Sequence, residues 1–124
     1  MQVMFATLAG SIEFIRSGNL RLLAVTNATR LETFPEVPAV NEFVPGYEAI
    51  SWSGIGAPRN TPSEIVERIS NEVQAGLADS AVRDRIVKLG NIPMPMSSAE
   101  FGKFIADETD KWSKVVKFAR LKPD

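Results

Sequence analysis

The spacing of apolar residues changes several times along the chain, and each change predicts a different element. An apolar run at 3–5 predicts a short buried strand, and 8–17 has the apolar spacing of a helix that Gly18 would end. A second apolar run, 20–26, predicts a strand that is buried on both faces. A strand, a helix and a strand in this order indicate a βαβ unit with a parallel pair of strands.

Prolines dominate the middle of the chain. Five of the eight prolines lie between Pro35 and Pro62, where each fixes its own φ angle and restricts the preceding residue to extended backbone. Within this passage 48–57 is predicted to be extended. Further on, 91–96 also contains prolines and is predicted to be a short edge-like strand, because proline cannot donate to a strand ladder.

Three helices are predicted after the proline-rich passage. Thr61 is expected to cap the first of them, with Pro62 at the first helical position. The second is expected over 80–89, where Gly90 would end it. A capping box at 97–100 is expected to open the third and longest. The chain is therefore predicted to be α/β, with two groups of elements on either side of the proline-rich passage.

Composition excludes several function classes. A formal net charge of −1 over 124 residues provides no basic surface for a phosphate backbone, so nucleic-acid binding is not expected. The chain has no cysteine and no histidine, which excludes thiol chemistry, the commonest general base and the commonest metal ligand. No catalytic residue set is visible, and neither an enzyme activity nor a cofactor is predicted.

Two further features of the sequence bear on targeting and metal binding. No apolar run reaches the roughly 18 residues of a membrane span, and the N-terminal residues do not have the pattern of a signal peptide. The densest acidic group is Asp107, Glu108 and Asp110, on the long predicted helix. Neighbouring helical positions point in different directions, so this group is predicted to be a solvated helix face and no metal site is expected.

The loop between the first predicted strand and helix is the best candidate for a binding site. Loops at the carboxyl ends of parallel strands favour anions where they lead into a helix N-terminus, because free N–H groups and the helix dipole point outward. Thr7 and Ser11 carry hydroxyl groups in this loop, and Gly10 allows close backbone approach. The alternative is that Thr7 or Ser11 only caps the helix.

Several motifs together make the chain similar to a known family. These are "VMF", "SIEFIRSGNLRLLAVT", "FPEVPAVNEF", "PGYEAISWSGIGAPRNTP" and the C-terminal "SSAEFGKFIADETDKWSKVVKFARLKPD". They resemble the Bug (Bordetella uptake gene) family, the periplasmic solute-binding receptors of tripartite tricarboxylate transporters. The resemblance covers essentially the whole chain, although members of that family are about twice as long.

The resemblance implies a fold and a domain organisation. Family members are two-lobed proteins of the periplasmic-binding-protein (Venus-flytrap) type, and this chain resembles their C-terminal half. On that basis 1–50 would be the last part of one lobe, and 51–124 would be the crossover and return to the other lobe. The proline-rich passage would then connect the lobes, where hinge positions should be few and defined.

The resemblance also implies a ligand and partners. Family members bind small carboxylates between their lobes and deliver them to the membrane subunits of the transporter, which implies a periplasmic location. Only Thr7, and then Ser11, match pocket-side positions. Many relatives have an aspartate near the ligand where this chain has Ala6, so neither a contact from Ala6 nor a preference for amino acids carries over. The ligand itself is not identified.

Two functions therefore compete at this stage. The first is a solute-binding receptor for small carboxylates, present as part of its fold. The second is a structural remnant that folds as a homodimer without binding a ligand, because two incomplete lobes would leave sheet edges and apolar faces for a second copy to cover.

Overall fold

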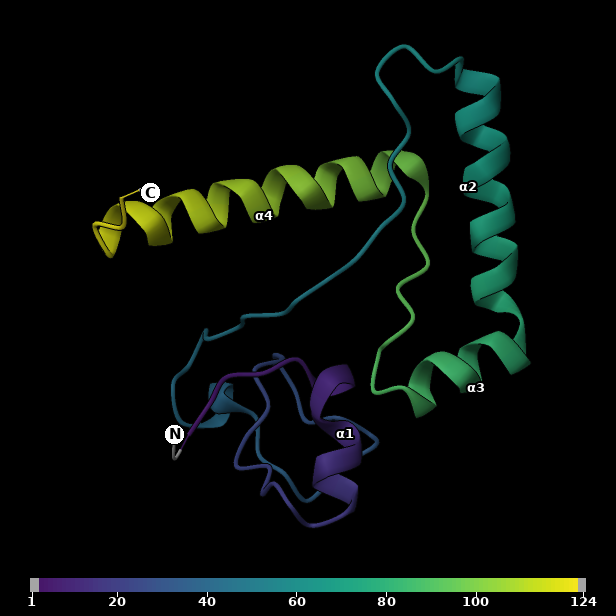
Figure 1. Cartoon of the computed structure of the whole chain (residues 1–124). Coiled ribbons are helices and arrows are strands. Elements are labelled where there is room, and N and C mark those ends of the chain that lie inside the picture. Colours follow the sequence, from purple (N-terminus) through teal and green to yellow (C-terminus); the bar gives the residue numbers. More distant parts are fainter. Residues whose placement is uncertain (1–2, 123–124) are drawn as a thin grey trace. The chain divides into compact units, whose positions relative to one another are not determined.

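The computed structural model describes residues 3–122 and is helical in its regular structure (Figure 1). Its elements follow one another in the order α1 (Leu8–Arg16), a short 3₁₀ helix η1 (Val40–Glu42), α2 (Ser63–Ala78), α3 (Ser80–Lys88) and α4 (Ser98–Phe118). The expected helices are confirmed, and their bounds differ from the expected ones by one or two residues.

The expected strands are wrong for the described residues. None of the segments 3–5, 20–26 and 91–96 forms a strand, and the single β-bridge within residues 3–122 is a parallel one between Val25 and Ala39. A strand exists only where a neighbouring segment accepts and donates its ladder hydrogen bonds. The backbone around Val25 has such neighbours for two residues. Val25 donates its N–H to the Pro38 carbonyl and accepts the N–H of Val40, both at 2.9 Å, and the Thr26 carbonyl accepts the N–H of Ala49 at 3.0 Å.

The chain divides into two compact units. The first comprises the residues up to Gly56 together with Ala81–Pro93, and the second comprises Ala57–Ser80 together with the chain from Met94 onwards. This division differs from the expected segments 1–50 and 51–124. The first unit reaches six residues further, and it also includes Ala81–Pro93, which contains most of α3. Assignment of these segments to two lobes stays a prediction.

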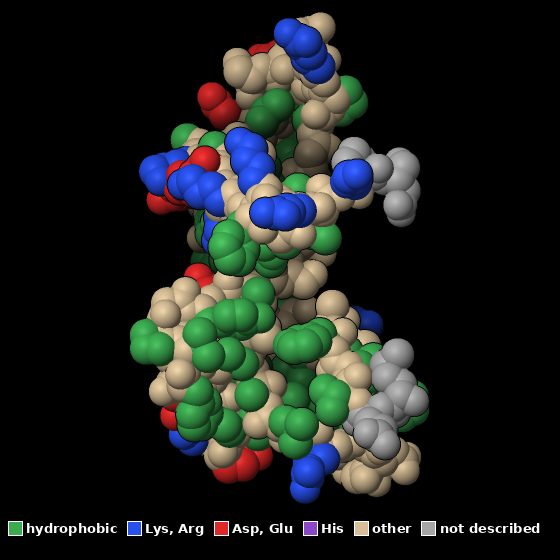
Figure 2. Space-filling view, turned by 90° about the vertical axis from the view of Figure 1, so that its left-hand side faces the viewer, with side chains coloured by type: hydrophobic (Ala, Val, Ile, Leu, Met, Phe, Trp, Pro, Cys, Tyr) green, Lys and Arg blue, Asp and Glu red, His purple; other side chains and the backbone are tan. Residues whose placement is uncertain are grey.

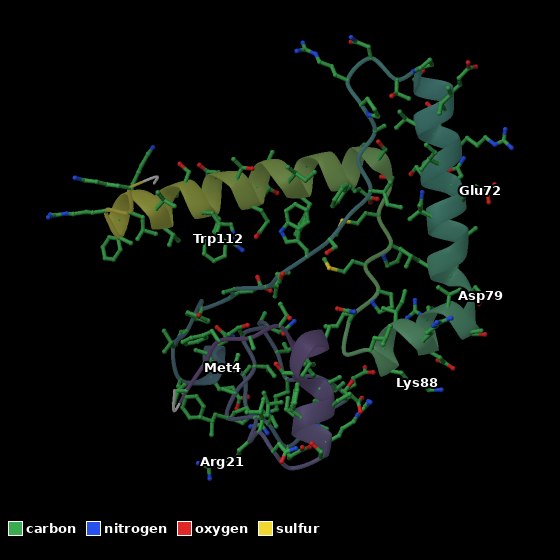
Figure 3. All side chains as sticks on the ribbon, in the orientation of Figure 1. Met4, Arg21, Glu72, Asp79, Lys88 and Trp112 are labelled. Carbon is green, nitrogen blue, oxygen red and sulfur yellow. The ribbon has the colours of Figure 1, made fainter. Side chains whose placement is uncertain are left out.

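In the first unit, α1 lies next to the residues at which α3 ends, Lys88 and Gly90. Arg16 reaches from the last turn of α1 to the carbonyl of Lys88, with 3.3 Å between its guanidinium nitrogen and that oxygen (Lys88 is labelled in Figure 3). Gly90 follows α3 with a φ of +80°, and a Cβ at that position would lie 3.2 Å from Ile12 Cδ1. Ile12 is only 3% exposed, so this contact buries the inner face of α1.

A small apolar core forms where the proline-rich passage folds back on the segment around Val25. Ala39 is fully buried, and Val25 and Val37 are nearly so. Partly buried Leu22, Leu31 and Phe34 pack against these three residues. The passage up to η1 is therefore a packed part of the first unit, and the chain leaves that unit only after Gly56.

An exposed ion pair holds the same passage in place. Arg30 donates to both carboxylate oxygens of Glu42 at 2.7 Å each, and to the carbonyl of Pro35 at 3.1 Å. Glu42 also accepts the backbone N–H of Ala39, the N-cap residue of η1. These bonds lower the pKa of Glu42 to about 2, with the Arg30 hydrogen bond as the largest cause and the Ala39 N–H next.

This ion pair predicts a dependence of stability on pH. Because the folded state lowers the pKa of Glu42 from 4.5 to about 2, its contribution is present above pH 4.5 and is lost as the pH falls toward 2. We expect Glu42→Gln to be less stable than the unmodified chain at pH 7 and the difference to shrink between pH 4.5 and 2. Urea unfolding of both chains across this pH range measures the difference in stability. A difference that does not change with pH would contradict the ion pair between Arg30 and Glu42 as its cause.

The second unit is built on α2 and α4, which contact each other. The capping box that opens α4 is confirmed: Ser97 Oγ accepts the N–H of Glu100, whose carboxylate accepts the N–H of Ser97 at 2.8 Å. The expected Thr61 cap of α2 is wrong. Its hydroxyl donates to the carbonyl of Pro58 at 2.8 Å, and Pro62 occupies the N-cap position without a capping side chain.

Among the described residues, no helix combines the length and the apolar character that a membrane span requires.

Candidate functional site

The N-terminal end of α1 is the site that the sequence indicated. Thr7 occupies the N-cap position in extended backbone, and its carbonyl accepts the N–H of Gly10 at 3.2 Å. Its side chain is exposed and makes no capping hydrogen bond. The Thr7 hydroxyl therefore does not cap the helix in this structure. Its Oγ1 lies beside the first turn, 3.2 Å from the position that a Cβ at Gly10 would take.

Electrostatics at this end of α1 favour an anion. The first turn carries no acidic residue, and Ala6 places no charge in the preceding loop. The basic residue of the helix, Arg16, lies in its last turn, where a cation is favourable against the helix dipole. The N–H groups of the first turn and the Thr7 hydroxyl are donors of the kind that a carboxylate accepts.

Ser11 has a different environment from Thr7. It is buried, at 9% exposed, and it lies one turn further along α1. Ser11 lines an open depression of about 290 Å³, here called the α1 depression. Its lining residues are Met4, Gly10, Ser11, Phe14, Asn19 and Leu20. The structure thus places the two predicted site residues on the same helix, but only Ser11 belongs to this depression.

Sequence reasoning missed the apolar residues of this depression. Met4 and Leu20 lie in 3–5 and 20–26, which were predicted to be buried strands, and Phe14 lies in the predicted helix 8–17. In the structure Met4 is 55% exposed, Leu20 37% and Phe14 56%. The sequence contains no signal that separates an uncovered apolar residue from a buried one. Figure 2 shows hydrophobic side chains gathered over the lower part of the face that it presents. The N-terminal region lies at the same height in Figure 1.

The acidic group on α4 does not form a metal site. Each of its carboxylates pairs with a lysine one turn away on the same helix, in the pairs Asp107–Lys103, Glu108–Lys111 and Asp110–Lys114. Glu108 also accepts the indole N–H of Trp112 at 3.0 Å (labelled in Figure 3). Among the described residues no group of carboxylates could hold a metal ion. The predicted solvated helix face is confirmed for Asp107 and Asp110, while Glu108 is largely buried.

A second depression lies along one face of α2 and has a volume of about 560 Å³. Its lining residues are Glu64, Ile65, Arg68, Ile69, Glu72 and Val73. All of them come from a single helix and are mostly exposed, so no second element brings polar groups toward them. Binding pockets place a few polar groups so that they converge on a ligand. This surface has no such convergence.

Comparison with known proteins identifies relatives of about three times this length. The chain is 30% identical to a UPF0065 protein of Bordetella bronchiseptica over 94% of its own length and 35% of that protein. It is 34% identical to Protein BugT of Bordetella pertussis over 86% of its own length and 33% of that protein. The chain thus spans about a third of the length of each of these two relatives.

A solved structure shares the fold. It is described as R. palustris Rpa4515 with adipate, and it superposes on 94% of this chain and 40% of its own with a TM-score of 0.86 and 35% identity. The chain therefore has part of the expected periplasmic-binding-protein-like α/β fold. The family model described as "Tripartite tricarboxylate transporter family receptor" matches residues 1–121. Because that match covers nearly all of the sequence, the chain belongs to the tripartite tricarboxylate transporter receptor family.

Proposed function

We propose that this chain contributes to a receptor that binds small carboxylates for a tripartite transporter. The observation that carries the proposal is its likeness, at 35% identity and a TM-score of 0.86, to a receptor whose structure was solved with adipate. Family membership supports the transport role, the membrane subunits of the transporter as partners, and the periplasm as location. The segment would represent the C-terminal part of such a receptor, as the motifs of the sequence indicate.

Within this function we assign the ligand carboxylate to the N-terminal end of α1. The Thr7 hydroxyl is exposed and makes no capping bond, so it can donate to a ligand without leaving a backbone group unpaired. The first turn has no carboxylate that would repel an anion. With Ala6 in the preceding loop, nothing there would pair with an ammonium group. These features favour dicarboxylates over acidic amino acids. The burial of Ser11 favours a packing role for that residue.

Thermal unfolding with a panel of ligands tests this function. The panel contains adipate, shorter dicarboxylates, citrate and the acidic amino acids, each at several concentrations. A ligand that binds only the native state stabilises it by about 2.7 kcal/mol at a concentration of 100 times the dissociation constant. We expect dicarboxylates to raise the unfolding midpoint selectively. Equal midpoints with every ligand, in a chain that unfolds cooperatively, would contradict the proposal.

Thr7→Val tests the assignment of the site. The substitution keeps the shape of the side chain and removes its hydroxyl, so it should reduce the ligand-induced shift. It should leave the midpoint without ligand unchanged, because the hydroxyl makes no capping bond. Thr29→Val, at another exposed threonine of the first unit, is the matched control and should keep the full shift. Equal shifts in both variants would remove Thr7 from the site.

A further inference from the structure

The C-terminal end of α4 concentrates the positive charge of the chain. Every charged residue from Lys111 to Lys122 is basic, which gives this segment a charge of +5. Because the whole chain has a net charge of −1, the other residues together carry −6. Figure 2 faces this end of α4 and shows Lys and Arg side chains gathered in the upper part of the view. The charge is therefore segregated, although the chain as a whole is nearly neutral.

Three of these five cations have no carboxylate beside them. The first two pair with carboxylates one turn earlier on α4, as described above. The other three are exposed and form no ion pair within residues 3–122; they are Lys117, Arg120 and Lys122. The helix dipole favours a cation in the last turn of a helix, where Lys117 lies, but it requires none at positions 120 and 122.

Arg120 occupies a position that usually holds glycine. The helix ends in a Schellman motif, in which Arg120 donates its N–H to the Lys117 carbonyl at 3.2 Å and Leu121 donates to the Val116 carbonyl at 3.1 Å. The residue after the C-cap has left-handed backbone in this motif, and the φ of Arg120 is +53°. A residue with a Cβ is strained there. A strained position that holds a long cationic side chain indicates a function for that side chain.

Exposed apolar side chains lie among these cations in the sequence. Phe118 is 91% exposed and Leu121 is 62% exposed. Neither residue lines one of the two depressions described above. Large apolar side chains between lysines and arginines are typical of surfaces that bind the headgroup region of an anionic bilayer. In such a surface the cations contact lipid phosphates, and the apolar side chains enter the boundary of the acyl chains.

We propose that Lys117, Phe118, Arg120, Leu121 and Lys122, here called the α4 basic end, dock on an anionic membrane surface. The three cations would contact lipid phosphates, and the two apolar side chains would leave water for the bilayer. An acidic protein would match the cations, but it would cover the apolar side chains only with an apolar site of its own. The bilayer fits both. The proposal goes beyond the receptor function given above and makes no use of the carboxylate contact.

Co-sedimentation with lipid vesicles tests the α4 basic end. The chain is mixed with vesicles of phosphatidylcholine alone, or of equal parts phosphatidylcholine and phosphatidylglycerol, at low and at high salt. At low salt we expect binding to be at least about tenfold stronger with the anionic vesicles, because each Lys or Arg near such a surface strengthens it about fivefold. High salt should weaken this binding, because it screens the charges. Equal binding to both kinds of vesicle would overturn the proposal.

Arg120→Gly separates the role of this side chain from its effect on folding. It should weaken binding to the anionic vesicles about fivefold. It should not lower the free energy of unfolding, because glycine adopts a φ of +53° without strain. Arg120→Lys should keep the binding, since it keeps the charge. The matched control is Arg21→Gln, at an exposed residue of the first unit (labelled in Figure 3), which should bind as the unmodified chain does. Equal losses in Arg120→Gly and Arg21→Gln would overturn the assignment.

Phe118→Ala distinguishes a bilayer from an acidic protein. Polyglutamate serves as a soluble acidic probe without an apolar phase. We expect Phe118→Ala to bind the anionic vesicles more weakly than the unmodified chain and to bind polyglutamate equally well. Unchanged binding to the vesicles would overturn the proposal, since charge alone would then explain the surface. Selective vesicle binding by a chain whose unfolding midpoint no dicarboxylate raises would support the α4 basic end and count against the proposed function.

Discussion

Replacing Gly90 with alanine should destabilise the chain by about 2–6 kcal/mol, as the sum of backbone strain and steric overpacking at about 1–3 kcal/mol each. The φ of +80° at Gly90 is strained for any residue with a Cβ, at about 1–3 kcal/mol. The added Cβ would also lie 3.2 Å from Ile12 Cδ1 and Leu8 Cγ and 3.3 Å from the Ala9 backbone nitrogen. Side chains can move slightly, but the backbone of α1 would have to shift away from residue 90.

Gly18→Ala separates the two effects. Gly18 has a similar φ of +76° after α1, but no atom lies within 4 Å of the position its Cβ would take. This control should therefore show the backbone strain alone, about 1–3 kcal/mol. Urea unfolding of both variants measures the difference. If Gly18→Ala were as destabilising as Gly90→Ala, the contact between α1 and Gly90 would have no steric consequence, and the packing of α1 on Gly90 would be contradicted.

Ile12→Ala should destabilise the chain by about 2–5 kcal/mol, the usual range for truncating a buried isoleucine. Ile12 is 3% exposed, and its Cδ1 packs against Gly90 in the contact between α1 and the end of α3. Truncation removes this contact and leaves a cavity next to α1. The same urea unfolding experiment measures the loss in free energy of unfolding. The loss should be largest when Ile12→Ala is the only substitution.

A surface control and a double variant sharpen this test. Phe118→Ala removes a larger side chain, but that residue is 91% exposed, so its effect should stay within about 0.5 kcal/mol. The double variant combines Ile12→Ala with Gly90→Ala. Because the smaller side chain at position 12 makes room for the new Cβ at position 90, the double variant should lose less stability than the sum of the two single losses. Strict additivity would show that the two residues do not share the contact that the structure gives them.

The placement of α1 also affects the proposed carboxylate contact, because Thr7 lies at its N-terminal end. Gly90 and Ile12 fix the inner face of α1, so variants at these two positions should lower both the stability of the chain and the ligand-induced shift. Thr7→Val should lower only the ligand-induced shift.

Helices and their ends were predictable from the sequence because local interactions decide them. Gly18 and Gly90 have the positive φ angles expected of residues that follow a helix, and the Ser97–Glu100 capping box opens α4 as predicted. These signals act between residues at most a few positions apart. Thr61 was the exception, because its hydroxyl donates to the Pro58 carbonyl and does not cap α2.

Strands and the surroundings of the site were not predictable in the same way. The run 3–5 has the composition of a strand, but strand formation depends on a partner elsewhere, and the described residues provide none. The hydroxyl pattern identified Thr7 and Ser11 together, and only the packing of α1 separated an exposed hydroxyl from a buried one.

The sequence by itself determined the helices, their caps, the absence of histidine and cysteine chemistry, and the resemblance to a receptor family that the comparisons confirmed. The tertiary structure decided that the proline-rich passage is held by Arg30 and Glu42, that α1 packs on Gly90, and that Met4 and Phe14 stay uncovered. Helix caps and helix ends depend on residues a few positions apart, so they can be predicted from the sequence. Pairing and burial depend on residues far apart in the sequence, and their meeting is fixed only when the chain folds.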